Sequence, residues 1–288
     1  MRTLLSETQE RQSPADRDAS ELLSDAFAKH LMKLAREKGS EYRSNSPFPN
    51  LYFDDFLPSA VAENALRDFP RPKELRWSEF SGKNEVKLAF DQAEKLPTSI
   101  RDILYFFNSR PMLEFLETLT GINGLIPDPY FVGGGVHQIN PGGFLEVHAD
   151  FNKHTKLKLD RRLNVLLYLN KDWPEEYGGH FELWKQDMSA SVRKILPLFN
   201  RMALFTTTST SYHGHPLPLQ CPPDRTRKSI AVYYYSNGRP EEEAQAGHDT
   251  LFQQRGGTSS GTTGGIKKAV RSFIPSRLAS AIDRARRG

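Results

Sequence analysis

The run from Phe144 to Trp184 opens with a histidine and an aspartate that are separated by a single alanine. His148 and Asp150 lie in a stretch that is typical of a β-strand, and alternate residues of a strand point to the same face. An imidazole nitrogen and a carboxylate oxygen on one face can bind the same divalent cation. Two ligands do not complete a metal site, so we expect further ligands to come from elsewhere in the chain.

A third ligand is available in the segment that follows the apolar run RMALF. His213 lies there, and in an antiparallel barrel a late strand can pass beside an earlier one. With His148 and Asp150 it would form a facial triad of two histidines and one carboxylate, the ligand set of non-haem Fe(II) oxygen chemistry. Only Gly214 separates His213 from His215, so the spacing alone leaves His215 as an alternative third ligand.

A strand rich in β-branched and aromatic residues, RKSIAVYYYS, begins fourteen residues after His213. Its first residue, Arg227, can pair with a carboxylate through two parallel hydrogen bonds. Ser229 lies on the same face of the strand and can add a hydroxyl group to that contact. An iron triad followed by such an arginine indicates a cosubstrate with a distal carboxylate, whereas Arg227 taken alone would be a solvated charge at a strand end.

The residues between about Phe48 and Ser236 resemble the Fe(II)- and 2-oxoglutarate-dependent oxygenases of the prolyl 4-hydroxylase type. The resemblance rests on the motif His-Ala-Asp at 148–150, the distal His213 and the motif Arg-Lys-Ser at 227–229. The run NVLLYLNKDWPEEYGGHFELW is also similar to the family's central strand pair, with its aromatic-Leu-Asn turn and its paired glycines.

The resemblance implies an α+β fold in which a double-stranded β-helix, of the jelly-roll or cupin type, carries N-terminal helices on one face. It implies a 2-oxoglutarate-dependent dioxygenase that hydroxylates an unactivated C–H bond and decarboxylates 2-oxoglutarate to succinate and CO2. The expected cofactor is Fe(II), with 2-oxoglutarate and O2 as cosubstrates and ascorbate in a supporting role.

The resemblance also assigns roles to individual residues. His148, Asp150 and His213 would bind the metal and form the catalytic centre. Arg227, with help from Ser229, would bind the C5 carboxylate of 2-oxoglutarate. Tyr168, on the strand LLYL, would point inward and hydrogen-bond the cosubstrate. Relatives often place a second carboxylate-binding tyrosine near the position of Asn140, so this chain departs from the family in how it anchors the cosubstrate.

The substrate that the resemblance implies is a prolyl or other amino-acid residue, or a small metabolite. The loops at 79–95 and 152–161 are expected to rim the entrance to the site. Cationic side chains gather in and just after the second loop: Lys153, Lys156, Lys158, Arg161 and Arg162. Such a rim favours an anionic substrate, although a solvated run of charges explains it equally well.

Two other functions are compatible with the same scaffold. A non-catalytic cupin-like protein would bind a ligand in its core or dock a partner, and the presence of three metal ligands together with Arg227 argues against it. A zinc hydrolase on the same triad would act without O2 or 2-oxoglutarate.

The other histidines of this region have structural explanations. His137 lies on the strand before the His-Ala-Asp motif and is expected to line the pocket or to belong to the core. His154 and His180 are expected at the surface or behind the ligands.

The first half of the chain is predicted to be helical and the second half to consist of short strands. Apolar residues recur at helical spacing at 18–38, 58–69, 96–107 and 110–120, and Gly39 is expected to end the first helix. Beyond a short strand at 51–53, strands are expected at 130–139, 144–148, 163–169, 180–184, 202–207 and 229–236.

The predicted organisation has four parts. Residues 1–45 form a polar leader and a helix, 46–240 the oxygenase domain, 241–265 a flexible linker and 266–288 a basic amphipathic tail. The tail has seven basic side chains and one acidic one, a pattern that suits an anionic membrane surface, an acidic partner or packing onto the domain itself.

The composition excludes several classes of protein. The formal net charge of +4 is concentrated in the tail, so the main domain has no nucleic-acid footprint. Cys221 is the only cysteine, which excludes intrachain disulfides and a cysteine-based zinc cluster. The N-terminus lacks the pattern of a secretory signal and no apolar stretch has membrane-spanning length, so a cytoplasmic location is expected.

Overall fold

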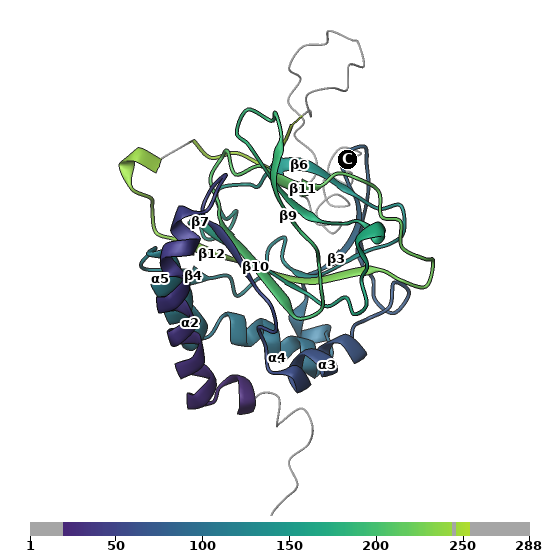
Figure 1. Ribbon diagram of the computed structural model, residues 1–288, viewed down its shortest axis with the longest axis horizontal. Coiled ribbons are helices and arrows are strands. Elements are labelled where there is room, and N and C mark those ends of the chain that lie inside the picture. The colour runs from purple at the N-terminus through teal and green to yellow at the C-terminus, as the bar shows by residue number, and fades with distance from the viewer. Residues whose placement is uncertain (1–19, 244–245, 254–288) are drawn as a thin grey trace, which may run out of the picture. The chain divides into compact units, whose positions relative to one another are not determined.

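The computed structural model describes residues 20–243 and 246–253, and its core consists of two antiparallel sheets that lie face to face (Figure 1). The larger sheet contains, in hydrogen-bonding order, β1 (Asn50–Phe53), β10 (Arg201–Thr206), β7 (Asp160–Tyr168), β12 (Arg227–Ser236), β5 (Gly135–Ile139), β3 (Val86–Phe90) and β2 (Ser78–Ser81), with β4 (Ile126–Pro127) paired to β12. The smaller sheet contains β13 (Leu251–Phe252), β6 (Leu145–Ala149), β11 (His213–His215), β8 (Phe181–Trp184) and β9 (Ser191–Ile195).

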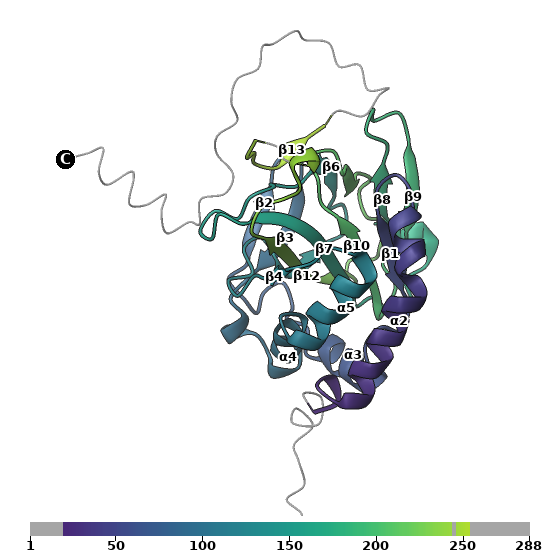
Figure 2. The same ribbon diagram turned by 90° about the vertical axis from the view of Figure 1, so that its left-hand side faces the viewer.

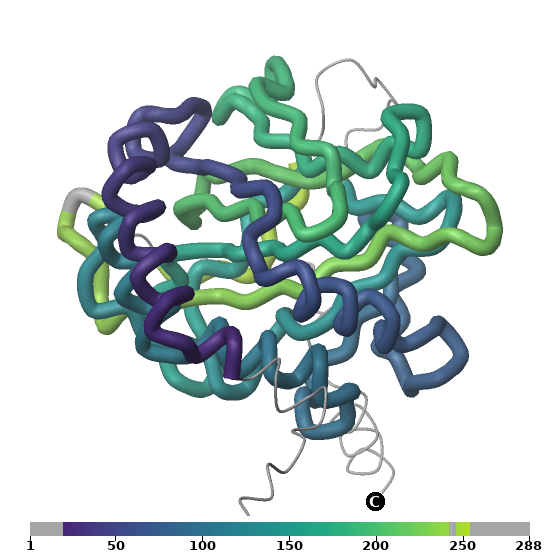
Figure 3. Tube along the Cα trace, turned by 60° about the horizontal axis from the view of Figure 1, so that its bottom comes forward, coloured from purple at the N-terminus to yellow at the C-terminus, as the bar shows by residue number. Residues whose placement is uncertain are grey.

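The two faces of the larger sheet differ because its central strands alternate. In β12, which runs through the middle of the molecule in Figure 3, Ile230 and Val232 join the main hydrophobic core. Arg227 and Ser229 lie on the opposite face, toward the smaller sheet. The register pairs Ser229 with Tyr168 of β7, so both side chains project to the same side of the sheet. The alternation of β12 thus separates the core from a polar pocket between the sheets.

Helices cover the face of the larger sheet that carries the main core (Figure 2). They are α2 (Asp25–Ser44), α3 (Ser59–Arg67), α4 (Thr98–Phe107) and α5 (Arg110–Thr120). Their fully buried residues include Leu31, Ile103 and Phe115, in the same cluster as Val165 of β7. The predicted helices on one face of a β core are therefore observed, and the opposite face of the larger sheet, toward the smaller sheet, is left for a site.

The first helix does not end at Gly39, as the sequence analysis predicted. The α2 helix continues to Ser44, and Gly39 is buried in it against α5. A Cβ atom at Gly39 would lie 3.2 Å from the Leu119 carbonyl oxygen, so glycine is needed there for close helix packing rather than for a turn. Beyond it, the Tyr42 hydroxyl lies 2.8 Å from Thr206 Oγ1, which ties α2 to the larger sheet.

Several strands lie where the sequence analysis predicted none. The segment 79–95, expected to be a rim loop, contains β3 and the end of β2, which form an edge hairpin of the larger sheet. The stretch 241–265 was expected to be a flexible linker, but its described part includes β13, which pairs with β6 at His148 and Ala149. Backbone pairing rather than composition decides the structure of both segments, since their side chains are mostly polar.

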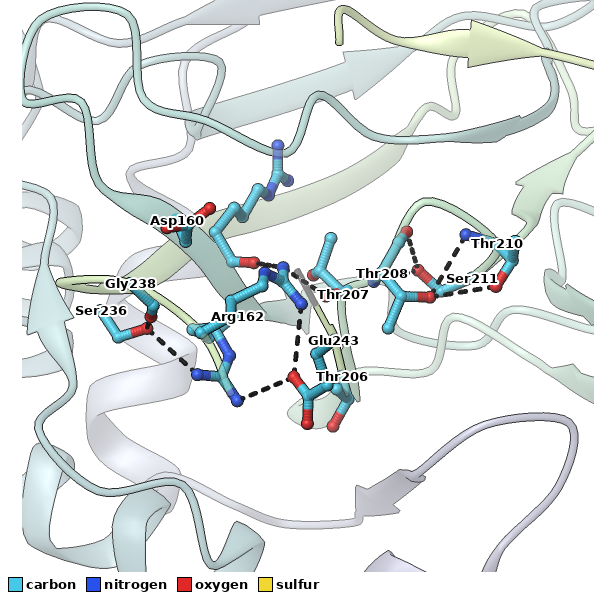
Figure 4. A network of polar contacts seen from close by, with 12 residues as sticks. Asp160, Arg162, Thr206, Thr207, Thr208, Thr210, Ser211, Ser236, Gly238 and Glu243 are labelled. Carbon is cyan, nitrogen blue, oxygen red and sulfur yellow. Dashed lines mark hydrogen bonds and ion pairs between the residues drawn. The ribbon is translucent and has the colours of Figure 1, made fainter. Parts of the chain in front are cut away.

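The predicted cationic rim is also wrong in part, because two of its residues are buried. Arg161 and Arg162 belong to β7, which begins before the predicted start at Leu163. Arg162 donates to Ser236 Oγ at 3.1 Å and to Glu243 Oε2 at 3.2 Å, and Figure 4 shows these contacts fastening the turn after β12. These two arginines hold structure together and do not present charge to a substrate at the entrance.

No helix of the described residues is long and apolar enough to cross a membrane. The polar leader and the basic tail predicted at 266–288 lie outside the described residues.

Candidate active site

A cluster of potential metal ligands lies at the edge where β6 and β11 pair. The register places His213 directly opposite His148, and Asp150 follows β6. One ligand atom from each of the three side chains lies within 4.8 Å of the other two, and all three residues are buried. His148 Nε2 is 3.6 Å from Asp150 Oδ1, and His213 Nε2 is 3.4 Å from Asp150 Oδ2. The structure thus brings together three residues that span 66 positions of the sequence.

Backbone contacts orient both imidazoles of this cluster. His148 Nδ1 lies 2.8 Å from the Glu146 carbonyl oxygen, and His213 Nδ1 lies 2.9 Å from the Ser211 carbonyl oxygen. A carbonyl oxygen only accepts, so each Nδ1 carries the proton and each Nε2 keeps its lone pair. Both lone pairs face the carboxylate of Asp150. This is the arrangement that a divalent cation with nitrogen and oxygen ligands requires.

Asp150 is held in place from behind by two polar side chains of β7. Asn164 Nδ2 donates to Asp150 Oδ2 at 2.6 Å, and Arg161 Nη2 lies 3.1 Å from the same oxygen. The Arg161 guanidinium is fully buried and stacks against the rings of Phe151 and Tyr233, at 4.4 and 3.5 Å. Since Oδ2 is occupied by these contacts, Oδ1 is the oxygen with more freedom to bind a metal.

The electrostatics of the cluster favour the protonation states that ligands need. Burial alone would raise the pKa of Asp150, but the positive charge of Arg161 and the contacts with His213 and His148 hold that pKa well below its usual range. Burial lowers the pKa of His213 to about 3, with His148 adding to the effect and Asp150 opposing it. A charged Asp150 carboxylate and a neutral His213 imidazole are therefore available at neutral pH.

The residues expected to bind the cosubstrate carboxylate lie in the same pocket. Arg227 is buried, its Nε donates to the Gly179 carbonyl oxygen at 2.8 Å, and its Nη2 lies 3.4 Å from the Tyr168 hydroxyl. Ser229 lies beside Tyr168 in the register. All of them line a cavity of about 80 Å³ together with the three clustered residues. The cavity therefore has potential metal ligands and a buried guanidinium in one small space.

Gly179, the second of the paired glycines, leaves the space that the Arg227 side chain occupies. It has a φ of +73°, and a Cβ atom there would lie 3.0 Å from Arg227 Cδ and 2.6 Å from Leu219 Cδ2. We expect Gly179→Ala to displace the guanidinium and weaken 2-oxoglutarate binding by at least ~10-fold, because a side chain is strained in this conformation, collides with Leu219 and crowds Arg227. Calorimetric titration of the Fe(II) protein under nitrogen measures the effect.

Gly178→Ala is the matched control for this prediction. Gly178 also has a positive φ, of +67°, but a Cβ atom there would meet nothing within 4 Å. An alanine there is therefore strained by the positive φ but does not collide with a neighbouring side chain. Equal losses in the two variants would mean that Gly179 acts through the turn and not through Arg227.

The structure resolves the position of the other histidines. His213, not His215, joins the cluster with His148 and Asp150, while His215 and His137 line the cavity elsewhere. His154 was expected at the surface or behind the ligands; it is fully buried and its Nε2 lies 3.2 Å from Asp128 Oδ1. His180 Nε2 lies 2.8 Å from Glu175 Oε1.

Several lining residues were not singled out from the sequence, and three of them bear on the chemistry of the cavity. Asn164 lies four positions before Tyr168 on the same face of β7, so strand alternation alone could have identified it. Ile139 and Lys87 face the cavity from β5 and β3. Asn140, expected near a second tyrosine of relatives, is exposed, so Ile139 is the residue of this segment that faces the cavity. Apolar Ile139 cannot bind a carboxylate.

Comparisons with known proteins agree with this site. A family model described as the 2OG-Fe(II) oxygenase superfamily matches residues 134–235. A search of curated proteins finds no match. The structure is similar to a prolyl hydroxylase from Trichoplax adhaerens, solved in complex with a hypoxia inducible factor oxygen degradation domain peptide fragment. The identity is 17%, the TM-score is 0.56, and the match covers 75% of this chain and 96% of that one.

A second similar structure is a prolyl-4-hydroxylase from Pseudomonas putida, with 16% identity, a TM-score of 0.50, and coverage of 71% of this chain and 100% of that one. These similarities confirm the predicted double-stranded β-helix with helices on one face. The matched segment 134–235 contains all three clustered residues as well as Arg227. Residues 134–235 are therefore similar to the 2OG-Fe(II) oxygenase superfamily, and the chain has a fold similar to that of the prolyl hydroxylases.

Proposed function

We propose that this enzyme hydroxylates an unactivated C–H bond with O2 and 2-oxoglutarate, and releases the hydroxylated product, succinate and CO2. One observation carries the proposal: His148, Asp150 and His213 share a small buried cavity with Arg227, a guanidinium that no carboxylate of the described residues neutralises. A buried cation without a counter-charge is costly. A ligand with a carboxylate at one end and metal-binding oxygens at the other would satisfy both ends of the cavity.

The residues present fit Fe(II), because two neutral imidazoles and one carboxylate are its typical ligands in oxygenases of this class. The chemistry that Fe(II) would supply when bound at His148, Asp150 and His213 is the activation of O2. Arg161 and Asn164 would fix the orientation of the Asp150 carboxylate. Both contacts are to Oδ2, so they stop the carboxylate from rotating and leave Oδ1 directed toward the metal site.

Arg227 would bind the distal carboxylate of 2-oxoglutarate, with Ser229 and the Tyr168 hydroxyl as further hydrogen-bond donors. Arg227 cannot swing away, because Gly179 accepts from its Nε and the ring of Tyr168 lies 4.9 Å from its guanidinium carbon. Burial keeps water from competing for these contacts, so each is stronger than it would be at the surface. The protein's part is to orient the cosubstrate and the reacting carbon.

We further propose a prolyl residue of a peptide as the first substrate class to test, with other amino-acid residues and small metabolites after it. The support is the likeness in fold to two prolyl hydroxylases, one of them solved with a peptide. The function of a fold lies in its site and loops, so a screen of all three classes is appropriate.

The test is succinate formation from 2-oxoglutarate by the protein with Fe(II), O2 and, as a proposed supporting agent, ascorbate. We expect slow succinate release without substrate and faster release with the right peptide or metabolite, matched by product that is heavier by one oxygen. Mass spectrometry of both products measures this. A protein that binds 2-oxoglutarate but never forms succinate would be a binding module, and hydrolysis that proceeds without O2 would indicate a zinc hydrolase.

A further inference from the structure

His215 is a buried polar residue of the cavity for which the assignments above give no role. Its exposed fraction is 5%, and neither of its ring nitrogens has a hydrogen-bond partner among the described residues. Native proteins rarely leave a buried imidazole unsatisfied on both sides, because each lost hydrogen bond is costly. The ligand that fills this cavity is the natural partner for at least one of these nitrogens.

Strand geometry places His215 away from the metal ligands and toward the other end of the cavity. On β11, His213 pairs with His148, whereas His215 pairs with Leu145, roughly 6–7 Å further along the strand. His215 is not one of the three clustered residues. Gly143, two residues before Leu145, lies against the Ile139 side chain, and the register places Ile139 opposite Arg227. These observations locate His215 on the Arg227 side.

Few groups near His215 compete for its hydrogen bond. Lys87 is paired with Glu85 at 2.9 Å, and Ile139, which the register places opposite Arg227, is apolar. An imidazole carries at least one N–H whether it is neutral or charged, so it can always donate to a carboxylate. A neutral donor also suits the charge balance, since the guanidinium of Arg227 already matches the single negative charge of a distal carboxylate.

We propose that His215 donates an imidazole N–H to the distal carboxylate of 2-oxoglutarate, from the smaller sheet, while Arg227 binds the same carboxylate from the larger sheet. The proposal rests on the proposed function. It gives this chain a polar contact to the carboxylate at the end of the cavity where Ile139 offers none.

The test compares two ligands that differ only at the distal end. 2-Oxobutyrate keeps the 2-oxo acid group that would face the metal but lacks the distal carboxylate of 2-oxoglutarate. Binding of each is measured by calorimetry to the Fe(II) protein under nitrogen, for the wild type and for His215→Leu, His215→Ala and His215→Asn. The Asn variant keeps an N–H donor, and Fe(II) content and melting temperature are recorded for every variant.

We expect His215→Leu and His215→Ala to weaken 2-oxoglutarate binding by about 10-fold and to leave 2-oxobutyrate binding within about twofold of the wild type. His215→Asn should recover part of the loss. His137→Leu is the matched control: His137 is also a cavity histidine, but only its Nε2 is a buried nitrogen without a partner, whereas both ring nitrogens of His215 are. It should not distinguish the two ligands.

Equal losses for both ligands, or unchanged 2-oxoglutarate binding in the Leu and Ala variants, would overturn the role of His215. If one of these variants does not fold, the other and the Asn variant still give the comparison. Failure of the proposed function is a different result: the wild type itself would then show no Fe(II)-dependent binding of 2-oxoglutarate.

Discussion

His213→Ala is expected to lose Fe(II) binding and all succinate formation, whereas His215→Ala is expected to keep its iron. The two histidines lie two positions apart on β11 and have the same exposed fraction, 5%. Only His213 places a ring nitrogen within 4.8 Å of ligand atoms of both His148 and Asp150. Removing one of three protein ligands from such a site removes the geometry that selects the metal. Metal analysis after gel filtration and a succinate assay measure the two effects.

This pair of variants separates the metal site from the rest of the cavity. His148→Ala should behave like His213→Ala. An outcome in which His215→Ala loses the iron and His213→Ala retains it would show that the third ligand has been assigned to the wrong histidine.

Asp150 is a less suitable position for an alanine variant than either histidine. Its carboxylate is the ion-pair partner of Arg161, which is fully buried. Breaking a buried ion pair from one side typically costs about 3–5 kcal/mol of stability, because the remaining charge stays buried. Loss of activity in Asp150→Ala would therefore combine loss of the metal with loss of fold, while the histidine variants leave no charge behind.

Arg227→Ala is expected to weaken 2-oxoglutarate binding by on the order of 2–5 kcal/mol, which is at least about 30-fold. The reason is that the distal carboxylate would be buried without its charged partner. Arg227→Lys should recover only part of the loss, because an ammonium group cannot form two parallel hydrogen bonds and does not reach the Gly179 carbonyl in the same way. Iron content should remain that of the wild type in both variants.

The measurement is the dependence of succinate formation on 2-oxoglutarate concentration, supported by direct titration under nitrogen. Arg201→Ala serves as a control for loss of an arginine from the larger sheet, since Arg201 pairs with Asp54 outside the cavity. A dependence on 2-oxoglutarate in Arg227→Ala that matches the wild type would refute the assignment of Arg227.

The parts of the site that could be predicted from the sequence are those with a fixed local spacing. His148 and Asp150 share a strand face because they are two residues apart, and the same rule places Arg227 beside Ser229. The partnership of His213 with His148 depends on how β11 pairs with β6, which no spacing along the chain specifies. The resemblance to a family provided that partnership.

Other features could not be predicted because the tertiary environment decides them. Arg161 and Arg162 stand in a run of charged residues that is typical of a solvated loop, yet Arg161 is buried by its ion pair with Asp150 and by two aromatic rings. Gly39 is a residue type that often ends a helix, but here the absence of a side chain lets α2 pack closely against α5. In each case the residue type is explained by a partner that is distant in sequence.

The pairing of β13 with β6 extends the folded domain beyond the segment that the family model matches. Phe252 packs its ring 5.4 Å from that of His148, and Asn152, two residues after Asp150, exchanges hydrogen bonds with Ala246 and His248. The segment 246–253 therefore acts as an outer wall for one imidazole of the cluster, although it lies outside the region that the family model matches. A minimal catalytic fragment cut at the end of that match would lack this wall, so the catalytic unit extends at least to Gln253, whose backbone N–H bonds the Val147 carbonyl oxygen.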